Sequence, residues 1–158
     1  MLQQLLSYDS IYLIKFYMID KQSDMLRTST APVSFDRSHV VPALRTVFNI
    51  LGAWRVKVKD WGILLGVSQP TIHRWKADPA VAARANSRDL AERLSYILGI
   101  YKALQILLSD PRAADSWVHR PNSASLFNGL TPLERMLAGN VSDLYEVRRW
   151  LDGQRGAA

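Results

Sequence analysis

The sequence contains no cysteine, and this absence removes several kinds of site at once. A chain without cysteine forms no disulfide, no cysteine-ligated zinc finger and no thiol nucleophile. It suits the reducing cytoplasm, which is where we expect this protein to act.

Recognisable catalytic and cofactor motifs are missing as well. The three histidines are scattered and lie at no metal-ligand spacing. Gly62 and Gly66 are not followed by the lysine and serine of a phosphate-binding loop. Carboxylates such as Asp115 and Glu134 are isolated, which suits helix caps or surface charges better than an acid–base pair. We therefore expect no enzyme, no metal site and no cofactor.

No long uninterrupted hydrophobic run is present. Residues 2–19 are apolar but include Gln3, Gln4, Asp9 and Lys15, which would not span a bilayer comfortably. A basic start and a small-residue cleavage site are also absent, so we expect neither a signal peptide nor a membrane protein. Residues 1–34 lack clean periodicity and are interpreted as a disordered N-terminal extension, with Met18 and Met25 as alternative start residues.

Two short helices joined by a tight turn are predicted over residues 58–76. Gly66 follows the first helical pattern at the position where a chain leaves a helix in a left-handed conformation. Ser68 offers a hydroxyl as the next N-cap, and Pro70 is tolerated in a first helical turn. Gly62 has no side chain, so two crossing helices can approach each other closely at this position. Together with inward-facing Ile72 and Trp75, this spacing predicts a helix-turn-helix.

The outer side of the second helix carries the expected DNA contacts. They are Ser68, Gln69, Pro70, Thr71, His73 and Arg74, with Lys57 and Lys76 as basic neighbours. Gln and Arg can form bidentate hydrogen bonds with base edges, whereas Lys neutralises phosphates. Residues 54–93 hold +4 of the net charge of +6, which favours a polyanionic partner. The alternative is an ordinary helical hairpin whose polar face is only solvated.

The remaining pattern is helical, and no stretch alternates convincingly enough to predict a strand, so the fold class is all-α. Helices are expected over residues 38–51, ended by Gly52, and over 87–108, 110–117, 131–138 and 142–153. Residues 77–87 are expected to be a loop, and residues 154–158 a flexible tail. This divides the chain into a helix-turn-helix DNA-binding and dimerisation domain (35–108) and a second helical domain (109–158).

Two of these helices offer surfaces to partners. The helix at 87–108 is apolar on more than one face, which predicts a central place in the core and a share in a homodimer interface. The last helix should direct Tyr145, Arg148 and Arg149 outward with Trp150 at the edge, and these residue types are enriched at interfaces. Alternatively, Trp150 is half-buried core, and the two arginines complement the helix dipole.

Residues 117–156, WVHRPNSASLFNGLTPLERMLAGNVSDLYEVRRWLDGQRG, resemble the toxin-binding domain of Xre/MbcA/ParS antitoxins. The matching landmarks are Trp117, Pro121, Asn122, Leu126, Phe127, Gly129, Pro132, Leu133, Leu137, Gly139, Val147 and Leu151. With the Xre-like helix-turn-helix, the resemblance covers residues 38–156. The N-terminal extension departs from it.

The resemblance implies an antitoxin of a type II toxin–antitoxin pair. Its partner would be a RES-domain toxin that consumes NAD or uses it for ADP-ribosylation. Members dimerise, bind the operator of their own operon and occlude the toxin's active site with the C-terminal region. The residues that this assigns to toxin binding are Asn122, Leu126, Phe127, Tyr145, Arg148, Arg149 and Trp150.

A second hypothesis is a free-standing helix-turn-helix transcriptional regulator, whose C-terminal helices serve only dimerisation or another ligand. Under the antitoxin hypothesis, the basic helix-turn-helix segment ends before the residues that resemble the toxin-binding domain begin. DNA binding and neutralisation are therefore expected to be separable, even by truncation after Asn140.

Overall fold

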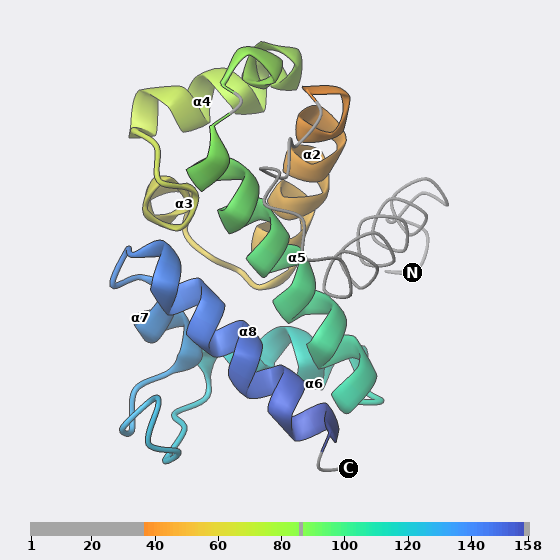
Figure 1. The fold of residues 1–158 in the computed structure, drawn as a ribbon, viewed down its shortest axis with the longest axis vertical. Coiled ribbons are helices and arrows are strands. Elements are labelled where there is room, and N and C mark those ends of the chain that lie inside the picture. The colour runs from red at the N-terminus through yellow and green to blue at the C-terminus, as the bar shows by residue number, and fades with distance from the viewer. Residues whose placement is uncertain (1–36, 86, 157–158) are drawn as a thin grey trace, which may run out of the picture.

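The computed structural model describes residues 37–85 and 87–156, and every regular element within these ranges is a helix. The all-α prediction is therefore confirmed for this part of the chain (Figure 1). The expectations for residues 1–34 lie outside it. The elements are α2 (Arg37–Ala53), α3 (Val58–Leu65), α4 (Gln69–Ala77), the 3-10 helix η2 (Pro79–Arg84), α5 (Arg88–Leu107), α6 (Pro111–Ser116), the 3-10 helix η3 (Trp117–His119), α7 (Pro132–Met136) and α8 (Val141–Gly156).

Helix α5 packs against helices from both halves of the chain. Ser87 caps it by accepting a hydrogen bond from the Leu90 amide at 3.1 Å. Its apolar residues, including Leu94, Ile97 and Leu104, are fully buried. It packs against α2, α3 and α6, and most extensively against α8. Figure 1 shows α5 running from the helix-turn-helix end of the molecule to the end formed by α6 and α8.

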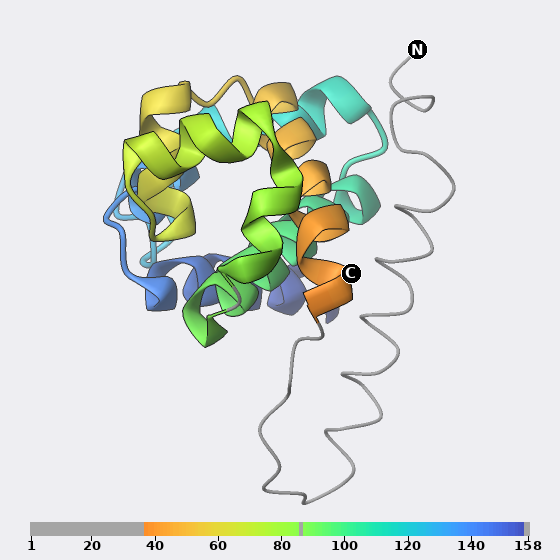
Figure 2. The same ribbon diagram turned by 90° about the horizontal axis from the view of Figure 1, so that it is seen from above.

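The core is continuous across the molecule. One cluster of buried side chains extends from Val40 in α2 to Leu151 in α8 and crosses the boundary expected at residue 108. Viewed from above, α2, α3, α4 and η2 are grouped around one end of α5 (Figure 2). The domain bounds 35–108 and 109–158 stay predictions, but their two halves share one core.

Two expectations for the N-terminal half are wrong. Gly52 does not end α2, which continues through Ala53; Gly52 lies exposed within the helix. Residues 77–87 are not simply a loop, because Pro79–Arg84 form the 3-10 helix η2. Asp78 caps this helix by accepting from the Ala80 amide at 3.0 Å, and Ala82 is fully buried. An Asp-Pro start, followed by small residues that fit beneath α2, explains the ordered turn.

The C-terminal helices follow their capping signals closely. Thr131 and Glu134 form the expected reciprocal capping box at the start of α7. Helix α8 begins at Val141 rather than Ser142, because the Asp143 carboxylate reaches back to the Asn140 amide at 3.0 Å. It also continues to Gly156, so residues 154–156 of the expected tail are helical. None of the helices in the described ranges is long and apolar enough to cross a membrane.

Candidate nucleic-acid interface and partner surface

The turn between α3 and α4 depends on two glycines. Gly66 has φ +67°, the left-handed conformation predicted for it. The Val67 amide donates to the Gly62 carbonyl at 2.9 Å, which brings the chain back over the end of α3. A Cβ at Gly62 would lie only 2.5 Å from the Val67 carbonyl oxygen. The close approach expected at Gly62 is therefore made by the backbone of the turn itself.

Helix α4 begins as predicted, except for the role of its cap. Ser68 occupies the N-cap position, but its hydroxyl makes a hydrogen bond with the Thr71 hydroxyl at 2.9 Å instead of accepting from the backbone. Pro70 lies in the first turn. Ile72 and Trp75 are buried, as their spacing predicted. These anchors fix which face of α4 remains outside.

The outer face of α4 presents most of the expected DNA contacts. Ser68, Pro70, His73 and Arg74 are exposed, and Thr71 is half-buried. Within the described residues, Arg74 forms no ion pair with a carboxylate. Its guanidinium is therefore available for a bidentate contact with a guanine edge or a phosphate.

Gln69 differs from the expectation of a free base-reading amide. Its Nε2 donates to the Val58 carbonyl at 3.3 Å and also to the Lys59 carbonyl. The side chain thus ties the start of α4 to the start of α3. A bidentate adenine contact uses one Nε2 hydrogen and the Oε1 acceptor, so Gln69 would first have to release at least one of these carbonyls. In this structure its amide links the two helices instead.

The two flanking lysines are exposed, and one of them is held in place. The Lys76 ammonium lies 5.0 Å from the centroid of the Trp61 ring, a cation–π arrangement. Trp61 is itself fixed, because its indole N–H donates to the Val56 carbonyl at 3.0 Å. Lys57 immediately precedes α3 and is exposed. Both are placed as cations beside the helix-turn-helix, which suits contact with phosphates.

Three aromatic rings pack together in the C-terminal half. Trp117 stacks on Trp150 with centroids 6.0 Å apart, and Phe127 meets both rings edge-on at 6.0 and 5.3 Å. Phe127 is completely buried, which contradicts the idea of an exposed contact at this position. Trp150 is half-buried, as the alternative interpretation held. The cluster joins the loop before α7 to α8.

The loop at residues 122–130 is closed by its own backbone. The Asn122 amide donates to the Leu130 carbonyl at 3.1 Å, and the Gly129 amide donates to the Asn122 carbonyl at 2.9 Å. The Asn122 side chain accepts from the Ala124 amide at 2.9 Å, so it shapes the loop. Leu126 is half-buried. Leu130 is 48% exposed, a surface residue that the sequence patterns did not single out.

The outward face of α8 is narrower than predicted. Arg149 is exposed, and Tyr145 is 44% exposed while its ring meets Tyr96 of α5 edge-on at 5.7 Å. Arg148 does not face outward: its side chain is 15% exposed, pairs with Asp152 at 2.7 Å and lies against Gly99 of α5. A Cβ on Gly99 would collide with the Arg148 guanidinium, so this glycine makes the space.

One buried polar group belongs to neither surface. An oxygen of Asp115 is buried without a hydrogen-bond partner among the described residues, and burial raises the pKa of this carboxyl group. Burial, together with the nearby Asp115 charge, raises the pKa of the Tyr101 hydroxyl. In the described ranges no three His, Asp or Glu side chains gather as metal ligands would.

Comparison with known proteins finds two family models that match successive parts of the chain. Residues 41–99 match the family model for the antitoxin Xre-like helix-turn-helix domain. Residues 103–156 match the model for the antitoxin Xre/MbcA/ParS C-terminal toxin-binding domain. The chain is also 41% identical, over 124 residues, to the uncharacterized protein y4oB of Sinorhizobium fredii (strain NBRC 101917 / NGR234). That alignment covers 78% of this chain and 92% of the relative.

Proposed function

The chain belongs to the Xre/MbcA/ParS antitoxin family, and from this premise we propose that its partner is a RES-domain toxin that consumes NAD. It is an antitoxin, not an enzyme, with a DNA-binding helix-turn-helix and a C-terminal toxin-binding domain. The observation that carries the proposal is the match of residues 103–156 to a toxin-binding domain. A free-standing regulator would have no use for such a domain.

The proposed toxin-binding surface consists of Leu126, Leu130, Tyr145, Arg149 and Trp150. Leu130, Tyr145 and Arg149 are exposed, and Leu126 and Trp150 each offer a partly exposed apolar edge. Aromatic and arginine side chains of this kind supply most of the binding energy in protein interfaces. Asn122, Phe127 and Arg148 from the predicted set support this surface from behind, through their hydrogen bonds and packing.

Occlusion of the toxin's active site is the mechanism that we propose for neutralisation. A cleft that holds the phosphates of NAD is electropositive, so it would repel Arg149 from its floor. Arg149 would instead pair with acidic groups at the rim of the cleft, while the apolar side chains cover the opening. A pair of this kind that becomes buried and is then broken on one side costs about 2–5 kcal/mol.

Operator binding is assigned to α4 and to the cations beside it. Arg74 and His73 would contact base edges, and Lys57 and Lys76 would contact phosphates. Readers of this type bind two half-sites as dimers. Most of α5 is covered within one chain, so its share of a homodimer interface would be limited to the end near Ile106, which is 53% exposed.

Neutralisation is tested by co-expressing the full chain with the product of the neighbouring gene, which the proposal expects to be a RES-domain protein. We expect restored growth, a restored NAD level and a complex that co-purifies. Arg149→Ala should weaken the complex about 30-fold or more, because breaking an ion pair that the interface buries costs at least about 2 kcal/mol. Arg88→Ala, which removes an exposed arginine on α5, is the matched control. NAD loss that proceeds at the same rate with and without the antitoxin would contradict the proposal.

A further inference from the structure

Arg93 is a buried cation that the helix pattern of α5 does not explain. It is 7% exposed, although it lies on a helix whose other charged residues reach solvent. Its Nε donates to the Asp89 carboxylate at 2.8 Å, one turn earlier. Asp89 is half in solvent, so this pair alone does not account for burying the guanidinium. The remaining donors go to backbone carbonyls on two other elements.

The first of these elements is the end of α3, where the helix-turn-helix begins its turn. Arg93 Nη1 donates to the carbonyls of Ile63 and Leu64, both at 3.3 Å. The last carbonyls of a helix have no intrahelical partner and carry the negative end of its dipole, so a cation there is doubly favourable. Gly66 lies directly against the Arg93 guanidinium, because a Cβ at position 66 would be 2.7 Å from Arg93 Nε.

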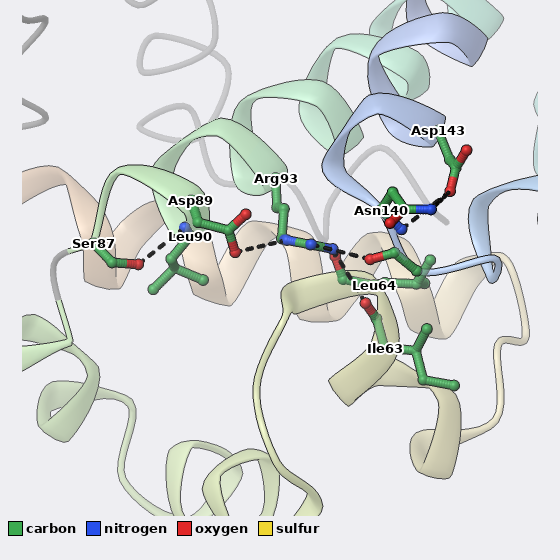
Figure 3. A network of polar contacts seen from close by, with 9 residues as sticks. Ile63, Leu64, Ser87, Asp89, Leu90, Arg93, Asn140 and Asp143 are labelled. Carbon is green, nitrogen blue, oxygen red and sulfur yellow. Dashed lines mark hydrogen bonds and ion pairs between the residues drawn. The ribbon is translucent and has the colours of Figure 1, made fainter.

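The second element is the connection between α7 and α8 in the toxin-binding domain. Arg93 Nη2 donates to the Gly139 carbonyl at 3.0 Å. Gly139 has φ +96°, and the next residue, Asn140, is held by Asp143. Asp143 is in turn paired with Arg135 of α7 at 2.6 Å. Figure 3 shows the fork of Arg93 between the end of α3 and this connection, with Asn140 and Asp143 beyond it.

We propose that Arg93 is a positioning residue for DNA recognition, which fastens the turn of the helix-turn-helix to the α7–α8 connection of the toxin-binding domain. The proposal rests on operator binding by the helix-turn-helix. The orientation of α4 is then set by both halves of the chain, because the carbonyls at the end of α3 and at Gly139 share one guanidinium. A displacement at residues 139–143 reaches the turn at residues 62–68 through Arg93.

The test compares three variants of the full chain with the wild type. Arg93→Lys keeps the charge but loses the fork: the three guanidinium nitrogens donate separately to Asp89, to the end of α3 and to Gly139, and the single ammonium nitrogen of lysine cannot occupy all three positions. Gly139→Ala disturbs the accepting carbonyl, since its φ of +96° disfavours a side chain. Arg88→Ala removes an exposed ion pair with Glu92 on the same helix and serves as the control.

Hydrogen–deuterium exchange without DNA measures the coupling itself. We expect ~10-fold faster exchange at residues 62–68 in Arg93→Lys and in Gly139→Ala, with α2 unchanged and with Arg88→Ala like wild type. In the double variant the two effects should not multiply, because the same contact is already lost. Multiplying effects, or equal acceleration throughout the chain, would overturn the coupling and leave Arg93 a general stabilising residue.

Mobility-shift titration with promoter DNA measures the consequence for recognition. Affinity for the promoter should fall at least ~5-fold in Arg93→Lys and in Gly139→Ala, while affinity for an unrelated duplex falls less. Coupled exchange with unchanged promoter affinity would overturn the positioning role. If the wild type bound no DNA, operator binding would fail, whereas the exchange experiment would still decide the coupling.

Discussion

At the scale of single residues, Asp115 shows how burial sets the charge that a side chain can carry. Its inner oxygen has no hydrogen-bond partner among the described residues, and the loss of hydration raises the pKa of the carboxyl group. The folded state therefore holds its proton to a higher pH than the unfolded state does. Between the two pKa values the folded protein binds more protons, so stability decreases as pH rises through this window.

Asp115→Asn should consequently raise the midpoint of thermal unfolding at neutral pH, because it removes the buried charge. The gain should shrink as the pH falls below the pKa values of both states, where the wild-type carboxyl group is also neutral. Thermal melts from pH 3 to pH 8 would measure this. A gain that is constant over the whole range would show that the charge is not the cause.

Glu134 supplies a control of opposite sign. Hydrogen bonds from the Thr131 backbone and hydroxyl lower the pKa of this carboxyl group. Its contribution to stability is present above the unfolded-state pKa and is lost as pH falls through the folded-state pKa. In the same melts, Glu134→Gln should lower the midpoint at neutral pH and converge with wild type in acid.

At the scale of elements, the end of α3 shows why a glycine in a helix can be required. Ala normally stabilises a helix interior by about 0.5–1 kcal/mol relative to Gly. At Gly62 this gain is opposed by a backbone oxygen 2.5 Å from the added Cβ, which cannot rotate away. Gly62→Ala should therefore destabilise the protein by about 1–3 kcal/mol, the usual cost of forcing an atom into a packed site.

Gly52→Ala is the matched variant, because nothing lies within 4 Å of a Cβ at that position in α2. It should stabilise the protein by about 0.5–1 kcal/mol. Urea unfolding at constant slope would measure both changes as shifts of the midpoint. Equal shifts for the two variants would show that the turn relaxes around an alanine at position 62.

Signals within a few residues of one another predicted the elements well. The left-handed Gly66, the capping box at Thr131 and the buried pair Ile72 and Trp75 all follow from short spacings. Contacts between side chains on different helices could not be predicted from such short spacings. The Gln69 side chain is bonded to α3, and Gly99 of α5 makes space for Arg148. Both contacts join different helices, so the pattern within one helix could not predict the bonds of Gln69 and wrongly predicted that Arg148 faces outward.

At the scale of the whole molecule, the DNA-binding and toxin-binding surfaces are distinct, but one hydrophobic core lies beneath both of them. Truncation after Asn140 would remove α8 and uncover the face of α5 that packs against it, including Tyr96 and Gly99. It would also leave the α7–α8 connection without its anchor at Asp143. Separability of the two activities must therefore be tested with surface substitutions, which leave the shared core and Arg93 intact.

Arg74→Ala is the substitution that should separate DNA recognition from neutralisation. Arg74 is exposed on α4, so its loss should leave folding and protection from the toxin unchanged. If it makes a bidentate base contact, specific binding should lose about 1–3 kcal/mol while non-specific binding changes little.

Lys57→Ala should instead weaken binding to all sequences and flatten its salt dependence, because a phosphate contact releases counterions whatever the sequence. Mobility-shift titrations at several salt concentrations, with a promoter reporter and growth under toxin induction in parallel, would distinguish these roles. Equal loss of specific and non-specific affinity in Arg74→Ala would assign Arg74 to the phosphates, and loss of protection would show that α4 also serves the toxin.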